Sequence, residues 1–518
     1  MNRLKIFFFG LLAFLFAAFI GIVIFLLIGS MHEPEIFIII IISVSAFNAI
    51  IMFILFNSSR QVNIKLCWIF VMGALPLFGT LIYLIFGTCP YDKKTWKAAK
   101  EYTKSYNRYE DYEFTKKFES GDKNIDQIFK YNFNIAQSPI YEKNSIRIIK
   151  DLTSLFDESI NLIRSAKKTI HLSTYIFKDG VWSRCIVTEL IKKAQEGVQV
   201  RFMYDWVGCY NRLPKKLIRQ LKEAKIEVAI FNPKGFNMFK SVTNYRSHRK
   251  VILVDNRAAI YGGSNIADEY LSISPKTNYW RDLNFYVEGE IANSMNLLFL
   301  YDWFNFSNHA KKRYQQKDKK FVNSISKILQ IQPSESNQIM QLVNSAPDLE
   351  EKQIEQTLIN LIKKAKNSIK IVTPYLFPTQ SIIDSLSSAA MSGIKVELIL
   401  PGRNDDKQTV IANRFHCTKL LSSGCKIYEY QGFIHSKYLI ADDSIVFSGS
   451  NNMDYRSLWI NFESALLIYN ETLSKEMINV FSIDKSNSKL INLDFIKSHI
   501  NIWHKIGYSL INIFHPLL

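Results

Sequence analysis

The sequence lacks paired cysteines and any cluster of metal ligands. Six cysteines are scattered along 518 residues with no CxxC pair, so neither a disulfide framework nor a zinc site is expected. They lie at positions 67, 89, 185, 209, 417 and 425. No group of histidines and carboxylates has metal-ligand spacing either, so we expect no metal and no cofactor. Unpaired cysteines of this kind are typical of a protein that faces the cytosol.

Acidic residues are scarce relative to basic ones. The chain has 64 lysines and arginines against 46 aspartates and glutamates, a net charge of +18. Residues 1–87 account for only +2, which leaves +16 of the +18 on the remaining chain. A basic surface of this kind favours a polyanionic partner, either a nucleic acid or an anionic membrane surface.

Charged residues are absent from two long apolar runs, residues 6–29 and 36–56. Each run is long enough to cross a bilayer as a helix, at about 1.5 Å per residue. No small-residue cleavage site follows the first run, so it indicates an anchor rather than a secretory signal. We therefore expect residues 1–90 to form a multi-pass membrane anchor in the cell membrane.

A third apolar run, residues 67–87, contains Pro76 and Gly79 at its middle. It could cross the bilayer or fold back as a re-entrant hairpin. Basic residues precede the first span, follow the second span and follow the third run, while Glu33 and Glu35 lie between the first two spans. Two crossings and a hairpin place every basic cluster in the cytoplasm, whereas three crossings cannot. The charges therefore favour the hairpin and place the chain that follows it in the cytoplasm.

The rest of the chain repeats itself. Residues 160–177 resemble residues 359–377, and each segment reads as an amphipathic helix followed by a β-branched strand. Further helix–turn–strand pairs match 194–205 with 390–401, and 221–231 with 420–430. This pattern predicts two homologous α/β lobes. We expect a connector at 91–145, lobes at 146–320 and 321–490, and an amphipathic tail at 491–518.

The strongest repeat is a set of one histidine, one lysine and one aspartate that occurs twice with the same spacing. His248, Lys250 and Asp255 match His435, Lys437 and Asp442, and a Gly/Ser/Asn-rich turn follows each set, at residues 262–265 and 449–452. A single match arises by chance in a few hundredths of chains of this length, at about one in twenty for each residue type. Two matches inside two copies of one helix–strand series therefore indicate a shared site.

These residue types fit phosphodiester chemistry. A neutral imidazole is nucleophilic near pH 7, and a second imidazole can deliver a proton to the leaving alcohol. In an extended strand, side chains two residues apart share one face, so Lys250 and Lys437 point where their histidines point and can stabilise the phosphate oxygens. Hydrogen-bond donors to the same oxygens are expected on the turns, from Ser264, Asn265, Ser450 and Asn452.

The carboxylates divide into two groups. Asp255 and Asp442 fall five positions beyond the lysines, on the opposite face of a regular strand, which favours a role in fixing the loop. Asp282 and Glu463 are better candidates to accept the histidine Nδ1–H and to set the tautomer.

The duplicated motif resembles the phospholipase D superfamily, and further stretches resemble its membrane-bound bacterial cardiolipin synthases. These stretches are "LPLFGTLIYLIFG", "NYRSHRK", "GGSNIADEYL", "WRD", "FIHSK", "NMDYRS" and the closing "PLL". The resemblance implies two homologous lobes of mixed β-sheets flanked by helices, which form one catalytic unit after a transmembrane helical block. It also implies that His248 is the nucleophile, that His435 is the acid, and that Asp255 and Asp442 belong to the active motif.

The chain departs from this family at three points: the extra span at 6–29, Leu283-Asn284 after "WRD", and Ser173-Thr174-Tyr175 where paired tyrosines are usual. The prediction is transfer of a phosphatidyl group between two phosphatidylglycerol molecules, which gives cardiolipin and glycerol through a phospho-histidine. Its partners would be an anionic phospholipid and the membrane, with no nucleic acid. A membrane-bound hydrolase or nuclease that uses the same histidines is the alternative. The acceptor alcohol and the oligomeric state stay open.

Overall fold

The computed structural model of the 518-residue chain describes residues 34–58, 62–87, 115, 117–149, 151–233, 244–271, 280–307, 329–347, 349, 351–403, 407–501 and 504. Contacts divide the chain into two compact units, one formed mainly by residues 1–91 and one by residues 92–234 and 245–508. The first apolar run, residues 6–29, lies outside the described residues.

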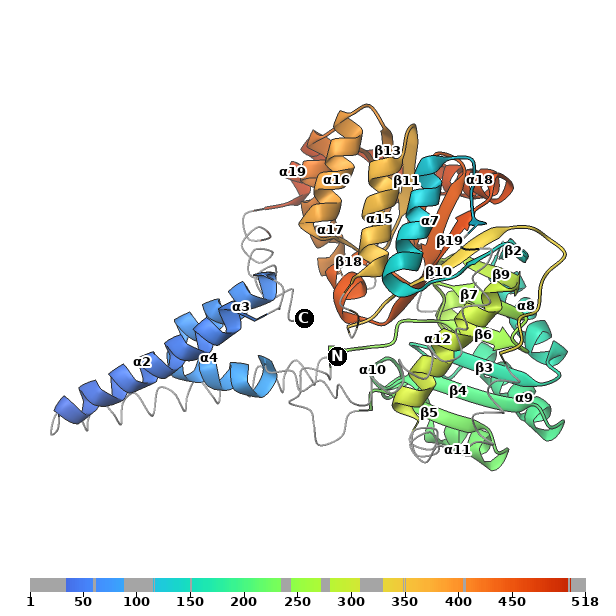
Figure 1. Cartoon of the computed structure of the whole chain (residues 1–518), viewed down its shortest axis with the longest axis horizontal. Helices are drawn as coiled ribbons and strands as arrows, with labels where there is room; N and C mark the ends of the chain where they lie inside the picture. The colour runs from blue at the N-terminus through green and yellow to red at the C-terminus, as the bar shows by residue number, and fades with distance from the viewer. Residues whose placement is uncertain are drawn as a thin grey trace. The chain divides into compact units, whose positions relative to one another are not determined.

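The described part of the first unit is helical (Figure 1). Helix α2 (Pro34–Phe56) is followed by α3 (Val62–Ala74), α4 (Pro76–Ile82) and the π-helix η1 (Tyr83–Gly87). The third apolar run bends at Leu75, and α4 folds back onto α3: a Cβ at Gly79 would lie 2.3 Å from the carbonyl oxygen of Val71. Only glycine permits this approach.

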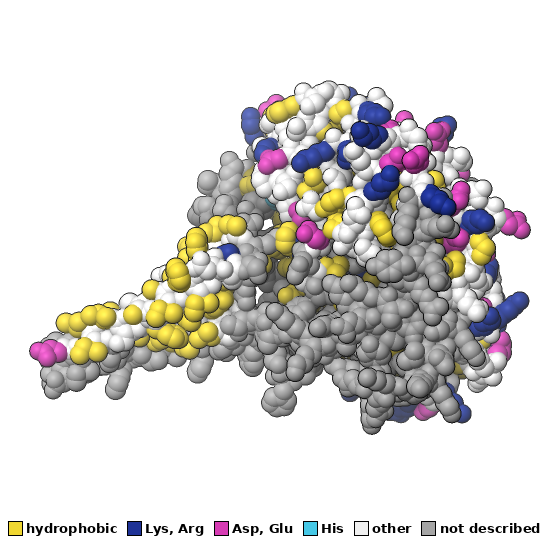
Figure 2. Space-filling model, viewed as in Figure 1, with side chains coloured by type: hydrophobic (Ala, Val, Ile, Leu, Met, Phe, Trp, Pro, Cys, Tyr) yellow, Lys and Arg dark blue, Asp and Glu magenta, His cyan; other side chains and the backbone are white. Residues whose placement is uncertain are grey.

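Large apolar side chains of α2 are exposed, including Ile39 at 63% and Phe53 at 70%, and Figure 2 shows apolar side chains along this unit. In the stretches that the structure describes, no helix combines the length and the apolarity that a membrane span needs.

The first lobe of the second unit is built on a seven-stranded sheet in the order β2-β9-β7-β6-β3-β4-β5. The bounds are β2 (Asn144–Ile149), β3 (Thr169–Thr174), β4 (Gln199–Asp205), β5 (Glu227–Phe231), β6 (Val251–Val254), β7 (Ala258–Gly262) and β9 (Asn284–Gly289). Helices α8 (Leu152–Ser165), α9 (Val181–Gln195) and α11 (Lys215–Glu223) share a core with one face of this sheet. Short elements are α10 (Trp206–Cys209), the 3₁₀ helix η4 (Asp268–Leu271) and β8 (Trp280–Arg281).

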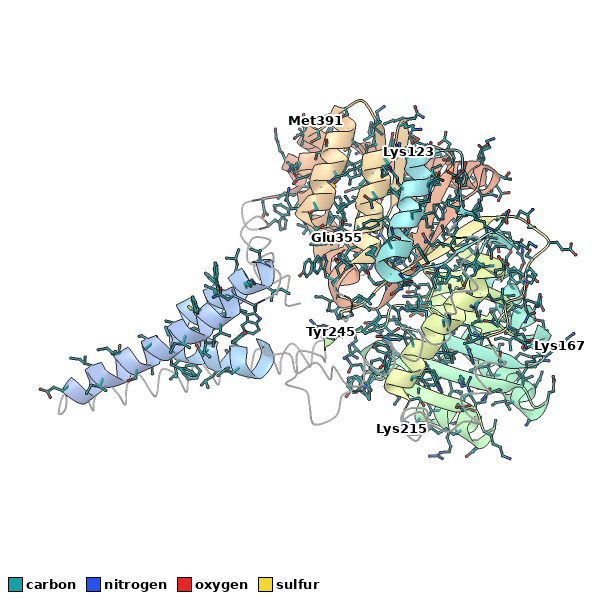
Figure 3. All side chains as sticks on the ribbon, viewed as in Figure 1. Lys123, Lys167, Lys215, Tyr245, Glu355 and Met391 are labelled. Atoms are coloured by element: carbon teal, nitrogen blue, oxygen red, sulfur yellow. The ribbon has the colours of Figure 1, made fainter. Side chains whose placement is uncertain are left out.

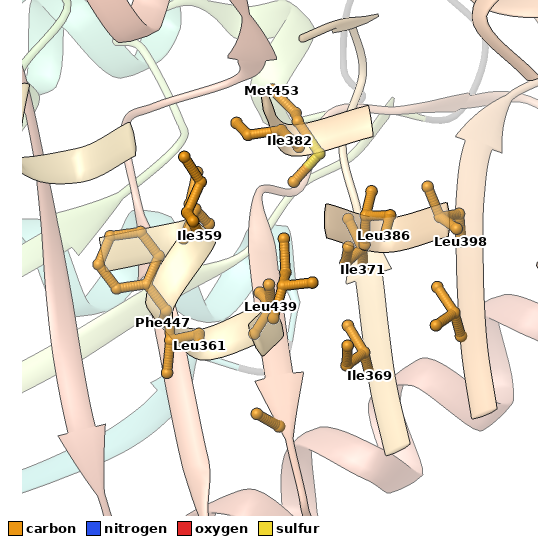
Figure 4. Close-up of a cluster of buried hydrophobic side chains, with 14 of the residues drawn as sticks. Ile359, Leu361, Ile369, Ile371, Ile382, Leu386, Leu398, Leu439, Phe447 and Met453 are labelled. Carbon is orange, nitrogen blue, oxygen red and sulfur yellow. The ribbon is translucent and has the colours of Figure 1, made fainter. Parts of the chain in front are cut away.

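The second lobe has nine strands in the order β1-β10-β19-β17-β16-β11-β13-β14-β20. They are β1 (Ile140–Tyr141), β10 (Ile339–Ser345), β11 (Ser368–Val372), β13 (Lys395–Pro401), β14 (Lys426–Tyr430), β16 (Tyr438–Ala441), β17 (Ile445–Gly449), β19 (Glu463–Tyr469) and β20 (Ser488–Ile491). Helices α7 (Lys123–Ala136), α15 (Gln353–Lys364), α16 (Gln380–Met391) and α17 (Lys407–Ser422) cover its outer face, and Figure 4 shows part of this core. Short elements are β12 (Leu376–Phe377), β15 (Phe433–Ile434), β18 (Met453–Asp454), the π-helix η5 (Arg456–Ile460) and α19 (Leu493–His499).

The inner faces of the two sheets share a third core with α12 (Ile291–Phe306) and α18 (Glu471–Ser486). Because both faces of the central strands are buried, their sequences are almost continuously apolar. In β6, for example, Leu253 faces this shared core while Ile252 and Val254 face the outer helices.

The expectation of a repeated helix–strand series is confirmed by α8 and β3 in the first lobe and by α15 and β11 in the second. The segment expected to be a connector supplies α7 and β1, and β1 pairs with β10 at the edge of the second sheet. The second lobe is therefore built from two segments of the chain: one precedes the first lobe and supplies α7 and β1, and the other follows the first lobe.

Candidate active site

The two histidines of the repeated motif are held by backbone bonds between the lobes. The His248 N–H donates to the carbonyl of Phe462 at 2.9 Å, and the His435 N–H donates to the carbonyl of Arg281 at 2.6 Å. The residue before His248, Ser247, forms a parallel bridge to Phe462, and β15 pairs in parallel with β8. Each motif is therefore fixed by a strand of the opposite lobe.

A buried carboxylate from the opposite lobe lies behind each imidazole. His435 Nδ1 lies 2.7 Å from Asp282 Oδ2. His248 Nδ1 lies 3.0 Å from Glu463 Oε1 and 3.0 Å from the carbonyl oxygen of Ser450. The hydrogen bonds expected between these carboxylates and the histidines are thus present in both halves. They fix the proton on Nδ1 and leave each Nε2 as the reactive atom.

The two lysines lie beside the histidines, as the strand periodicity requires. Lys250 Nζ is 2.5 Å from the carbonyl oxygen of His248, and Lys437 Nζ is 2.9 Å from His435 Nδ1 and 3.3 Å from its Nε2. Burial lowers the pKa of Lys250 to about 7 and that of Lys437 to about 8. Charge repulsion from Lys437 also lowers the pKa of Lys250.

Burial keeps both imidazoles neutral. It lowers the pKa of His248 below its ordinary value and, with the help of Lys437, lowers that of His435 to about 3. Burial alone would raise the pKa of Asp282 and Glu463, but the adjacent lysines and histidines outweigh it and hold both carboxyls below their ordinary pKa. Neutral imidazoles backed by ionised carboxylates suit nucleophilic attack on phosphorus.

Asp255 and Asp442 lie at the far ends of β6 and β16, away from the histidines. Each has a positive φ, 53° and 50°, in a tight hairpin turn. The Asp255 carboxylate accepts hydrogen bonds from the backbone N–H groups of residues 167–169, and that of Asp442 from residues 366–368. In Figure 3, Lys167 lies at the edge of its lobe, whereas Tyr245, three residues before His248, lies near the junction of the lobes. The geometry supports the loop-fixing interpretation and places neither carboxylate among the catalytic groups that the motif implies.

The expected turn donors have other partners. Ser264 Oγ accepts from Asn284, and the Asn265 amide bonds to the Ile176 N–H and the Tyr270 hydroxyl. Ser450 Oγ donates to Glu463 at 2.5 Å. Within the described chain, Asn452 Oδ1 is buried with no hydrogen-bond partner. Three of these four side chains are therefore hydrogen-bonded within the protein, and the role of the four as donors to a phosphate stays a prediction.

Aromatic side chains around the histidines were not predicted as site residues. The ring of Tyr175 packs edge-on against His248 at 5.3 Å, and Trp280, Phe433 and Tyr270 surround His435. Trp280 and Phe433 flank the motif residues in sequence, but only the pairing of β8 with β15 brings them together. Across the described residues, no group of three or more His, Cys, Asp or Glu side chains could hold a metal ion.

Replacing Asp442 by alanine is expected to cost about 1–2 kcal/mol of stability, because three backbone N–H groups lose their acceptor. The turnover of the folded protein should stay within about threefold of wild type, because the carboxylate does not reach the histidines. Urea unfolding and the rate of lipid turnover measure the two effects. Asp443→Ala, in the same turn but ion-paired with Lys370 at the surface, is the matched control. A catalytic Asp442 would instead abolish turnover with stability preserved.

Comparisons with known proteins agree with this geometry. A family model described as "Cardiolipin synthase, PLD-like domain" matches residues 159–303 and 358–485. A cardiolipin synthase of Clostridium perfringens is 36% identical over 457 residues, which cover 87% of this chain and 93% of that protein. The major cardiolipin synthase ClsA of Bacillus subtilis is 32% identical over 90% of this chain and 96% of its own length. The solved phosphatidylserine synthase of Haemophilus influenzae shares the fold, with a TM-score of 0.55 at 14% identity over 75% of this chain and 97% of its own.

Proposed function

Because this chain belongs to the family of cardiolipin synthases with phospholipase D-like domains, we propose that it is a phosphatidyltransferase that joins two phosphatidylglycerol molecules into cardiolipin and releases glycerol. The observation that carries the proposal is the pair of imidazoles, each hydrogen-bonded to a buried carboxylate of the opposite lobe.

The reaction has two displacement steps. In the first, His248 Nε2 attacks phosphorus and the bond to glycerol breaks as His435 donates a proton to the departing oxygen. In the second, the hydroxyl of another phosphatidylglycerol gives its proton to His435 and attacks phosphorus, and the bond to His248 breaks. A bound phosphodiester anion counters Lys437 and so favours the protonated form of His435 in the complex. Lys250 and Lys437 stabilise the charge on the phosphate oxygens.

The alkaline side of the pH profile is expected to follow the lysines. Their charge is lost as pH rises through about 7 to 8, whereas the pKa values of both histidines are lowered, so the imidazoles are already neutral in this range. We expect kcat/KM for phosphatidylglycerol to fall above about pH 7, where Lys250 begins to lose its charge, since this parameter reports the free enzyme. A guanidinium does not lose its proton, so Lys250→Arg should be slower but should keep its remaining activity to higher pH. Equal alkaline decline in both proteins would contradict the assignment.

The function is tested with purified protein and phosphatidylglycerol labelled in its head-group glycerol and its acyl chains. Lipid analysis should show cardiolipin and free glycerol in equal amounts. Phosphatidic acid as the sole lipid product would instead make the protein a hydrolase, and cleavage of DNA in a parallel reaction without lipid turnover would make it a nuclease.

We further propose that the first unit attaches the enzyme to the membrane and that the lobes are cytoplasmic. The exposed apolar side chains of α2 support attachment, and the placement of basic residues supports the orientation. Protease digestion of sealed vesicles tests it: lobes that are protected in inverted vesicles would refute the cytoplasmic side.

A further inference from the structure

The two halves of the site share one backbone plan but differ in the side chains that flank each histidine. Beside His435, β15 and β8 pair Phe433 with Trp280. Beside His248, the equivalent bridge joins Ser247 to Phe462, so the residues one step earlier in each strand are Arg246 and Asn461. An aromatic pair on one side thus corresponds to a cationic and an amide side chain on the other.

The rings on the His435 side form a continuous surface, here called the aromatic wall, made of Tyr270, Trp280 and Phe433. Their centroids lie 5.7, 5.4 and 5.5 Å from the His435 ring. They also contact each other, with Trp280 4.4 Å from Phe433 and 4.6 Å from Tyr270. Trp280 and Phe433 are only partly buried, so part of the surface of each residue is exposed.

The other side is polar. Arg246 lies 3.6 Å from the buried Asp205 carboxylate, and Asn461 Nδ2 is 3.4 Å from Glu463. In the described chain, Tyr175 is the one aromatic ring that packs on His248. The two histidines therefore differ in their surroundings: aromatic rings flank His435, whereas polar side chains that are bonded within the protein flank His248.

The aromatic side matters in the second step. His435 accepts the proton of whichever molecule attacks phosphorus, so the attacking oxygen must approach beside His435. Water gains little from an aromatic surface, whereas the carbon backbone of a glycerol head group gains contact area when it displaces water there.

We propose that the aromatic wall determines the acceptor: it selects the hydroxyl of a second lipid over water. This inference rests on the proposed function. In the competing reaction, water oxygen bonds to phosphorus, the bond from phosphorus to His248 Nε2 breaks, one proton of water passes to His435, and phosphatidic acid is released. The wall suppresses this branch because the glycerol head group of the second lipid packs on the rings and displaces water from the space beside His435.

Trp280→Ala and Phe433→Leu are the test variants, assayed as full-length purified protein with labelled phosphatidylglycerol. The expected result is a rise of about tenfold in the ratio of phosphatidic acid to cardiolipin, the range in which a pocket contact discriminates substrates. Glycerol release, which counts both branches, should fall much less than cardiolipin formation. Trp280→Phe keeps a ring at this place and should restore most of the wild-type ratio.

Phe495→Ala is the matched control, because it removes a ring that packs on another histidine, His499 of α19, with the ring centroids 4.1 Å apart. An unchanged product ratio in Trp280→Ala and Phe433→Leu, with glycerol release retained, would overturn the inference, as would an equal rise in Phe495→Ala. If Trp280→Ala does not fold, the product ratio of Phe433→Leu decides. Failure of the proposed function is a separate result, because wild-type protein would then make no cardiolipin.

Discussion

Replacing His248 by asparagine is expected to lower cardiolipin formation by at least about 10⁴-fold, because the atom that bonds to phosphorus is removed. His435→Asn should cause a similar loss with phosphatidylglycerol, since glycerol then leaves without a proton. The measurement is cardiolipin formation by purified proteins whose thermal unfolding matches that of the wild type. His416→Asn, which changes a histidine that packs on Phe377 outside the cluster, controls for loss of an imidazole.

The two variants are separable with a lipid whose leaving group needs no proton. His435→Asn should then still form the covalent intermediate, and a label on phosphorus should remain on the protein at residue 248. His248→Asn should acquire no label. Full cardiolipin formation in either variant contradicts the two-histidine mechanism, and label at residue 435 in His248→Asn would exchange the two roles.

Much of the site could be predicted from the alternation of side chains along a β-strand. Side chains alternate along a strand, so Lys250 and Lys437, two residues after their histidines, lie on the same face as those histidines. Asp255 and Asp442, five residues after the lysines, lie instead in the turns at the far ends of the strands. Both statements depend on geometry within a few residues, which the sequence specifies directly.

Contacts between distant segments were harder to predict. The sequence predicted Asp282 and Glu463 as hydrogen-bond partners of the histidines. It did not predict that each carboxylate binds the histidine of the other lobe. Ser264 and Asn265, which we expected to donate to a phosphate, also accept hydrogen bonds from Asn284 and from the Ile176 N–H, contacts that only the packed structure reveals. Strand β1 has two residues, too few for any periodic signal, so its place in the second sheet was not foreseen.

Because each buried carboxylate binds the histidine of the opposite lobe, replacing either carboxylate is expected to cause a second large loss of activity. Asp282→Asn and Glu463→Gln should each lower kcat with phosphatidylglycerol by about 10²- to 10⁴-fold, because an amide no longer fixes the Nδ1–H tautomer or stabilises the imidazolium. The KM should change little, since neither carboxylate is placed to contact the lipid. Steady-state kinetics and thermal unfolding measure both, with Asp484→Asn, a buried aspartate paired with Arg281, as a control for loss of a buried charge.

The lipid whose leaving group needs no proton can show which histidine each carboxylate supports. Asp282 lies behind His435, the proton donor, so Asp282→Asn should form the covalent intermediate at close to the wild-type rate with this substrate. Glu463 lies behind His248, the nucleophile, so Glu463→Gln should form it slowly. A carboxylate that served the histidine of its own lobe would give the reverse pattern. Rapid-quench measurement of labelled protein therefore tests the crossed arrangement directly, because a purely structural loss would slow both variants alike.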